Sequence, residues 1–571
     1  MNRVLTAGLA AGLVAAALNL QAADVPLGHK DFYPSDDHPV MERGDMTGVF
    51  PGAKDVALEW DHRTGKNIIW KCRMPYWSNS APIVVGKKAF VGSEPDELVC
   101  VDAEKGTVLW KRSIFIDEFI PAEDREGVRK ALREANDEAM ALDIPGPWPA
   151  RWLEAVKPLD DDAMAETARR IAGTLNRLKA KGLPTKRSEL RGVDTGAPSR
   201  EGLALLEKHK VMDWGRDAAK FGPFPHGTWG YHLGFTMPSP TSDGKHVWYQ
   251  TSLGAVACLD LDGKVVWSKR LRTVGPTSYR AFTGGGSPVL VKDKLYYHDH
   301  LAQREVYGIV AVDKNTGKEV WRRPRDRSDK DYCGAGGRGS SGIVPLRLGG
   351  KDFLATPGRY ILDAATGETV GDMGLPIDAR RAHAIGGNSL IFVSALSGNW
   401  VAHVRLGFRG DQVAADLIWK VIRGTTWNSA IVYEGNMYMP KGMDHRPLGW
   451  YPLEKPKDAV ADKNQELPRA REIPAAKCFF TPPRSTDDDE DQGASDPWQY
   501  STAAVAEGHL FVGDDKNGMQ VFRLDGEKSA VVCRNFMDLW VRANPFFQGN
   551  RMYVRTMHYL YCIGEGAPVA P

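Results

Sequence analysis

The chain has 571 residues, of which 42% are hydrophobic and 26% are charged. Its 74 lysine and arginine residues nearly balance its 72 aspartate and glutamate residues, giving a formal net charge of +2. A nucleic-acid-binding protein normally carries a strongly basic surface, and a disordered chain combines low hydrophobicity with high net charge. The composition argues against both classes, and 59 glycines with 17 tryptophans indicate a β-rich chain with many tight turns.

Residues 1–22 have the pattern of an export signal. Arg3 supplies a positive charge, an apolar run covers residues 4–18, and Ala22 offers a small residue for cleavage. The apolar run is short for a membrane span of about 20 residues, which disfavours an uncleaved anchor. A lipid-modified N-terminus would need a nearby cysteine, and the first cysteine is Cys72. We therefore expect a periplasmic or secreted protein without a transmembrane segment after signal removal.

One motif recurs along the chain. An apolar strand ends at an aspartate, a glycine follows in a tight turn, and a second strand ends at a tryptophan. Aspartate starts such a turn by accepting backbone N–H groups, glycine supplies the positive φ, and an indole can fill the space between adjacent sheets. The copies lie at Trp60–Trp70, Leu98–Trp110, Val256–Trp267 and Ile309–Trp321, with a weaker one at 360–370.

The spacing of this motif predicts the architecture. Asp260 and Asp313 are 53 residues apart, and Asp313 and Asp363 are 50 residues apart. A period of this size, with paired strands in each unit, is typical of a β-propeller. Eight predicted strands begin after a Ser-Pro, Ala-Pro or similar dipeptide, and each would be the first strand of one unit. The last of these units lacks a final strand. We expect the strand ending at Trp70 to supply it, because joining the two chain ends removes free sheet edges. The predicted fold is all-β, an eight-bladed propeller with a split last blade.

Two insertions interrupt the predicted ring. The first contains apolar residues at helical spacing over 128–142 and 164–178, and Ser199 is the expected N-cap of a third helix that ends near Asp213. The second is rich in proline and charge and includes the acidic run Asp487–Asp491. The predicted organisation is a signal at 1–22, the N-terminal part of the propeller with blade 1 at 23–116, a helical insertion at 117–221, further blades at 222–445, a charged insertion at 446–495, and the last blades with ring closure at 496–571.

The seven cysteines do not form a recognisable metal or redox motif. Their odd number leaves at least one outside any intramolecular bridge, and no Cys-x-x-Cys pair is present. Several lie in strand-like runs, so we expect small buried apolar residues. His298 and His300 are two apart in a strand-like run and can share one face, which makes them weak metal-ligand candidates. Further ligands are not evident, so no metal site is predicted.

The Asp-x-x-x-Gly-x-x-x-Trp units resemble the PQQ-like β-propeller repeat of quinoprotein alcohol dehydrogenases and of the outer-membrane-protein assembly factor. The stretch Gly44–Gly48 followed by Trp60 and Trp70 is also similar to the start of exported PQQ-like repeat proteins. The resemblance covers most of the chain outside the two insertions and implies the propeller fold. It makes PQQ with calcium a candidate cofactor, although the adjacent cysteine pair typical of those dehydrogenases is missing. Haem-attachment and lipid-accepting cysteine motifs are missing too, so neither family's role transfers directly.

Loops that lead into the first strands of the blades should line the mouth of the central channel. Arginine provides a fork for carboxylate or sulfate and tryptophan provides a stacking face, so these loops suit an anionic or sugar-like ligand. His383 beside Arg381 is a weak candidate for a catalytic base with a charge clamp. The alternative is structural, with tryptophans packed between blades and arginines paired to carboxylates. The predicted ligand-binding residues are Arg338, His383, Trp427, Asn428, Trp498, Arg542 and Asn544.

Three functions remain open from the sequence. The leading hypothesis is an exported binding or scaffold protein that presents the propeller face to a protein partner, a small molecule or a glycan. The first alternative is a PQQ-dependent alcohol or sugar dehydrogenase, which predicts bound quinone. The second is a cofactor-free carbohydrate-active enzyme at the channel mouth, which predicts that changing His383 or Arg381 to alanine abolishes activity without unfolding.

Overall fold

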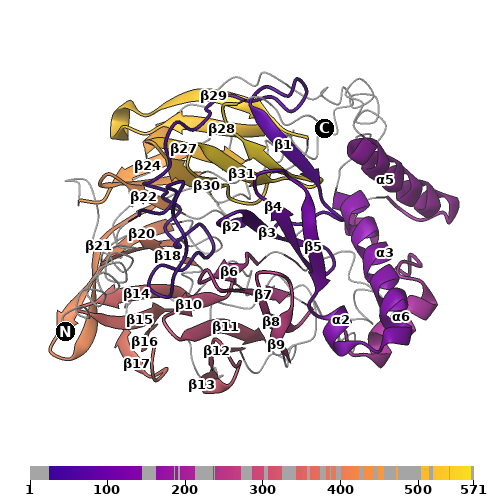
Figure 1. Ribbon diagram of the computed structural model, residues 1–571, viewed down its shortest axis with the longest axis horizontal. Coiled ribbons are helices and arrows are strands. Elements are labelled where there is room, and N and C mark those ends of the chain that lie inside the picture. The colour runs from indigo at the N-terminus through magenta and orange to yellow at the C-terminus, as the bar shows by residue number, and fades with distance from the viewer. Residues whose placement is uncertain are drawn as a thin grey trace, which may run out of the picture.

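The computed structural model describes the chain from residue 25 to residue 566, and Figure 1 shows its ribbon. The residues outside the described set are 1–24, 144–161, 186, 191–192, 212–235, 237, 252, 272–285, 301–306, 325–342, 357–359, 373–380, 386–387, 394–399, 423–429, 441–447, 455–470, 474–502, 514–517, 539–540 and 567–571. The predicted signal lies among them.

The described strands form four-stranded antiparallel meanders arranged in a ring (Figure 1). Three successive sheets follow the N-terminal region. Their strands are β2 (Ile83–Val85), β3 (Lys88–Ser93), β4 (Glu97–Asp102) and β5 (Val108–Ser113); β6 (Thr241–Ser242), β7 (His246–Thr251), β8 (Ala255–Asp260) and β9 (Val265–Arg270); and β10 (Val289–Val291), β11 (Lys294–His300), β12 (Tyr307–Asp313) and β13 (Glu319–Pro324).

An eight-stranded sheet continues the ring and consists of two meanders. Their outer strands β17 and β21 pair in parallel, which joins the two meanders along one edge. The all-β propeller class predicted from the sequence is confirmed, while the predicted number of eight blades depends on counting this sheet as two. The strands are β14 (Val344–Leu348), β15 (Lys351–Ala355), β16 (Tyr360–Asp363), β17 (Thr369–Asp372), β18 (Arg381–Ile385), β19 (Ser389–Val393), β20 (Trp400–Arg409) and β21 (Gln412–Ile422).

Two further sheets precede the closing one. They contain β22 (Ile431–Tyr433), β23 (Asn436–Pro440), β24 (Leu448–Pro452) and β25 (Arg471–Ile473), and then β26 (Ala504–Ala506), β27 (His509–Gly513), β28 (Gly518–Arg523) and β29 (Ala530–Phe536), with a short 3-10 helix η5 (Gly526–Lys528) before β29. Strands β24 and β25 fall inside the range 446–495 that the sequence predicted as an insertion. The proline and charge around them conceal their apolar residues, although Leu448, Trp450 and Tyr451 are buried. The acidic run Asp487–Asp491 lies outside the described residues.

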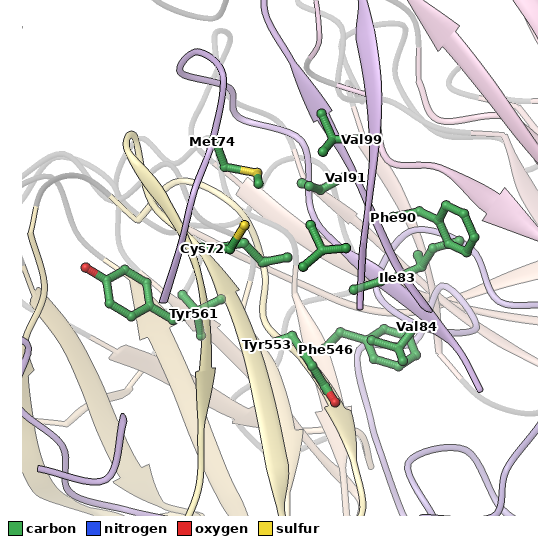
Figure 2. Packing of buried hydrophobic residues seen from close by; sticks show 14 of the residues in the cluster. Cys72, Met74, Ile83, Val84, Phe90, Val91, Val99, Phe546, Tyr553 and Tyr561 are labelled. Atoms are coloured by element: carbon green, nitrogen blue, oxygen red, sulfur yellow. The ribbon is translucent and has the colours of Figure 1, made fainter. Parts of the chain in front are cut away.

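The closing sheet combines both ends of the chain. Strands β30 (Phe546–Gln548), β31 (Arg551–Arg555) and β32 (Tyr559–Ile563) are followed by β1 (Ile68–Arg73), which pairs antiparallel with β32. This is the pairing expected for a last blade that lacks its own final strand. First strands of neighbouring sheets contact one another around the centre, and β30 contacts β2, so the last sheet lies against the first. Figure 2 shows side chains of both sheets, among them Cys72 and Phe546 on one and Ile83 and Val91 on the other, meeting in one buried layer.

Each repeated turn links one sheet to the tryptophan of the sheet before it. In the second sheet, Asp260 accepts N–H groups of the turn and Gly263 has a φ of +86°. The indole of Trp110 lies against Gly263 and donates to the carbonyl of Leu261 at 3.1 Å. Trp70, Trp267 and Trp321 make equivalent bonds at 3.2, 2.9 and 3.1 Å. The roles predicted for aspartate, glycine and tryptophan are therefore confirmed.

The connection from β5 to β6 carries the helical insertion. Its elements are α2 (Ile116–Phe119), η1 (Ala122–Asp124), α3 (Arg125–Asp143), α5 (Asp162–Ala180), η3 (Arg187–Leu190) and α6 (Arg200–Lys208). Ser199 caps α6 as predicted, because its hydroxyl accepts the N–H of Gly202 at 3.2 Å. Helix α6 ends at Lys208, before the predicted end near Asp213. Within the described residues, none of the helices has the length and apolarity needed to span a membrane.

Candidate functional site

One face of the ring carries the connections between successive sheets. Strands of a meander alternate in direction, so these connections share an edge with the turns between the second and third strands of each sheet. The helical insertion is one of these connections, and we call this side the insertion face. The loops predicted to bind a ligand also belong to it, whereas the Asp-Gly turns lie on the opposite face.

The predicted ligand residues are placed only in part. Arg542 and Asn544 lie between β29 and β30 on the insertion face, Arg542 half-buried and Asn544 buried. His383 and Arg381 lie on β18, where their backbones pair with Ile391 and Val393, and the structure describes only that placement. Residues outside the described set are Arg338, Trp427, Asn428 and Trp498. The ligand site at the channel mouth therefore stays a prediction.

The candidate metal ligands belong to an ordinary strand of the third sheet. His298 and His300 lie on β11 and pair with β12. Asp299 between them is buried and forms an ion pair with Arg322 at 2.6 Å. Among the described residues, no group of three or more His, Cys, Asp or Glu side chains is arranged to hold a metal ion.

The described cysteines are buried and do not form disulfides with one another. Burial raises the pKa of Cys72 and Cys533 to about 11 and that of Cys100 and Cys562 to about 12, so these thiols stay protonated at neutral pH. Cys258 is buried in the same way. The prediction of small apolar residues is confirmed for these five.

The centre of the ring contains part of the chain's own N-terminal region. Residues 40–50, which we call the axial segment, bridge Val40 to Ser242 of β6 and Val49 to Val505 of β26. The N–H of Phe50 also donates to the carbonyl of Val505 at 2.8 Å. Figure 1 shows this region in indigo inside the ring of sheets. The axial segment thus pairs with first strands of sheets that lie well apart around the ring.

Two charged residues fix the axial segment near the insertion face. The Glu42 carboxylate accepts from Ser287, just before β10, at 2.9 Å. Arg43 is buried and donates to the carbonyl of Ala430, just before β22, at 2.8 Å and to that of Thr47 at 2.9 Å. Burial lowers the pKa of Arg43 to about 10, so it remains charged at neutral pH. The two contacts join sheets separated on the ring by the eight-stranded sheet.

The position of the axial segment determines whether a PQQ cofactor could fit on the propeller axis. In this fold a quinone bound on the axis would need an open space between the first strands. Here backbone bridges and the Arg43 guanidinium occupy that space at the level of β6, β10, β22 and β26. The described residues therefore do not fit a quinone on the axis at this level.

A second cluster is buried where the insertion meets the closing sheet. Asp538 Oδ2 lies 2.7 Å from Nδ1 of His558, whose Nε2 lies 2.8 Å from the hydroxyl of Thr167 on α5. Asp538 Oδ1 accepts from Tyr561 at 2.9 Å, and the Tyr561 oxygen lies 2.7 Å from Nδ1 of His62. We call Asp538, His558, Thr167, Tyr561 and His62 the seam cluster.

The proton positions in the seam cluster follow from the carboxylate. Burial opposes ionisation of Asp538, but the hydrogen bond from His558 and the nearby imidazoles outweigh it and lower the pKa of that carboxyl. An ionised carboxylate only accepts, so Nδ1 of His558 carries a proton and donates to Asp538. The order hydroxyl–imidazole–carboxylate is the one used to activate nucleophiles. Thr167 and His558 are each only 8% exposed, so the arrangement acts as a fixed bridge between elements.

A neighbouring set of polar contacts holds α3 and α5 to the first sheet. The Tyr76 hydroxyl, the Asp137 carboxylate and the Arg170 guanidinium contact one another, and Arg170 lies 4.6 Å from the centroid of the Tyr76 ring. Burial is the largest influence on Tyr76, and its pKa lies well above the ordinary value. Arg555 donates to the carbonyl of Tyr76 at 2.6 Å from the end of β31. Tyr76 therefore connects the closing sheet, through Arg555, to the helices of the insertion, through Arg170 and Asp137.

Sequence reasoning missed the axial segment and the seam cluster for different reasons. Gly44 and Gly48 have φ values of +81° and +80°, and their close spacing was the available signal for a tightly packed turn. The seam cluster has no comparable signal, because Thr167, Asp538 and His558 are distant in sequence and each is ordinary in its own context. Only the closed ring brings them together.

Comparisons with known proteins agree with the repeats. The family model described as outer membrane protein assembly factor BamB matches residues 42–143 and 228–333. BamB from Moraxella catarrhalis is 13% identical with a TM-score of 0.38, covering 56% of this chain and 82% of that chain. The quinohemoprotein alcohol dehydrogenase ADHIIG from Pseudomonas putida HK5 is 13% identical with a TM-score of 0.46, covering 96% and 84%, and that from Comamonas testosteroni is 11% identical with a TM-score of 0.43, covering 93% and 81%.

Comparison with the curated proteins finds no match. The matched ranges contain the copies Leu98–Trp110, Val256–Trp267 and Ile309–Trp321, whose turns and indoles make the contacts described above. The matched repeats and the ring of four-stranded meanders support a PQQ-like β-propeller family for this chain.

Proposed function

We propose that the chain is an exported binding or scaffold protein that presents its insertion face to a protein partner. The observation that carries this proposal is the axial segment, which fills the centre of the ring at the level of the first strands. A propeller filled by its own chain is suited to binding at its outer surfaces. The description of the matching family model, an outer-membrane-protein assembly factor, supports a role in protein binding.

The dehydrogenase alternative has less support. It requires a quinone on the axis, where Arg43 and the backbone bridges lie, and the sequence has no adjacent cysteine pair. The carbohydrate-enzyme alternative relies on His383 and Arg381, whose side chains are not described. The hydroxyl–imidazole–carboxylate arrangement of the seam cluster does not favour an enzyme either, because its hydroxyl is buried.

Photo-crosslinking in the source organism tests the binding face. A photoreactive amino acid replaces Lys130 or Glu201, which are exposed on the insertion, or Lys105 or Asn315, which are exposed on turns of the opposite face. We expect a discrete adduct with a protein partner from the first pair and none from the second. Equal adducts from both pairs, or none from either, would contradict the proposal.

Two measurements on the purified protein test export and cofactor binding. Mass analysis of the exported form should give an N-terminus after Ala22, the predicted cleavage site. After incubation with PQQ and Ca²⁺ and removal of free ligand, the absorbance spectrum should show no retained quinone. Stoichiometric retention of quinone would replace the scaffold proposal with the dehydrogenase alternative.

A further inference from the structure

We propose that the helical insertion is a clasp that holds the ring closed at the sheet shared by the two ends of the chain. This role is independent of which partner the insertion face binds. It assigns a mechanical function to a segment that the sequence alone identifies only as a helical connection between blades.

The closing sheet is the place where the ring needs such a clasp. The other described sheets are built from strands that follow one another along the chain, so a connecting segment links each strand to a neighbour in its own sheet. Strand β1 instead joins β32 without a covalent turn between them. The β1–β32 ladder therefore depends on tertiary contacts at its ends.

Helix α5 contacts both partners of this ladder. On the C-terminal side, the Thr167 hydroxyl bonds to Nε2 of His558, in the turn that leads into β32. On the N-terminal side, Glu166 forms an ion pair with Arg73, the last residue of β1. Adjacent positions of one helix thus hold β1 and β32 at the same end of their ladder.

Further contacts attach the insertion to the sheet beyond the ladder. Arg170 of α5 and Asp137 of α3 hold Tyr76, in the connection from β1 to β2. Asn136 of α3 donates to the Glu94 carboxylate, in the turn between β3 and β4, at 3.0 Å. The insertion consequently spans the closing sheet and the first sheet, which are the two sheets that meet at the ring's junction.

Several of these groups are buried, which strengthens the attachment of the helices to the ring. Glu94 and Asn136 are each less than 1% exposed, so detaching α3 would separate a buried carboxylate from the buried amide that donates to it. A buried polar group that loses its partner is destabilising, and more so when it is charged.

Hydrogen–deuterium exchange on the full-length mature protein tests the clasp. Thr167→Val keeps nearly the same shape and removes the hydroxyl that bonds to His558, and Arg170→Met releases Tyr76 and Asp137. We expect amides of β1 and β32 to exchange about tenfold faster in either variant, because loss of one buried hydrogen bond typically changes local opening by about that factor. Amides of β7 and β8 should keep their wild-type protection.

Ser268→Ala is the matched control. Ser268 on β9 donates to Glu118 of α2 at 3.1 Å, so this variant also removes a hydroxyl bond between insertion and ring, but away from the junction. It should leave exchange in β1 and β32 unchanged. Wild-type protection of β1 and β32 in both Thr167→Val and Arg170→Met, or equal opening of these strands in Ser268→Ala, would overturn the proposal.

Discussion

Replacing Gly263 with alanine tests how strongly a turn glycine connects neighbouring sheets. The added Cβ would lie 2.7 Å from the Trp110 ring, well inside the distance of about 3.5–4.0 Å at which carbon atoms normally meet. The left-handed backbone at φ +86° costs an alanine about 1–2 kcal/mol, and forcing an atom into a packed contact costs about 1–3 kcal/mol. We expect Gly263→Ala to lower the free energy of unfolding by about 2–5 kcal/mol.

Gly65 provides the matched control for this prediction. It occupies the same place in the first copy of the motif and has a φ of +74°, but its Cβ would meet no atom within 4 Å. Gly65→Ala should therefore show only the backbone strain, about 1–2 kcal/mol. Urea unfolding followed by tryptophan fluorescence measures both variants. Equal losses would show that the contact with Trp110 adds nothing and that the argument from packing is wrong.

Three other predictions concern single groups. Trp267→Phe removes the indole N–H that donates across to the next sheet and should destabilise the protein by about 0.5–1.5 kcal/mol in the same urea assay, in which unchanged stability would contradict the assigned bond. Native protein treated with a thiol reagent at neutral pH should gain at most two labels by mass, on Cys333 and Cys478, because the other thiols are buried; a third label would contradict that burial. The lowered pKa of Asp538 means that its ionised form stabilises the fold above the unfolded pKa, and that this contribution is lost as pH falls through the folded pKa. As the pH falls below the ordinary carboxyl pKa, Asp538→Asn should consequently lose less stability than the wild type, and parallel pH curves would contradict the assignment.

The repeated part of the fold can be predicted because its chemistry is local. Asp260, Gly263 and Trp267 lie within one turn and the strand that follows it, and each residue type has a preference that the structure confirms. The same holds for Ser199, whose capping bond depends only on the residues that follow it. Such features depend on a few neighbouring residues, so a single sequence carries the whole signal.

The candidate site could be predicted much less well, because it depends on distant contacts. Arg43 looks like a surface residue in the sequence, yet it is buried and its main partner is the carbonyl of Ala430. His558 becomes distinctive only beside Asp538 and Thr167. Strand β24 was missed for another reason, since the proline and charge around it outweighed its short apolar run. The ligand residues predicted at the channel mouth remain a prediction.

The pairing of β1 with β32 also determines the order in which the protein can be completed. Sheets built from consecutive strands can form as soon as their own segment has been synthesised, whereas the closing sheet must wait for Tyr559–Ile563 near the far end of the chain. Strand β1, the first of the described strands in chain order, is thus among the last of them to find its partner. A chain truncated before Tyr559 would leave β1 as an unpaired edge, the kind of surface that other chains add to. Incomplete copies of this protein should therefore be the ones that aggregate, while the finished ring has that edge covered.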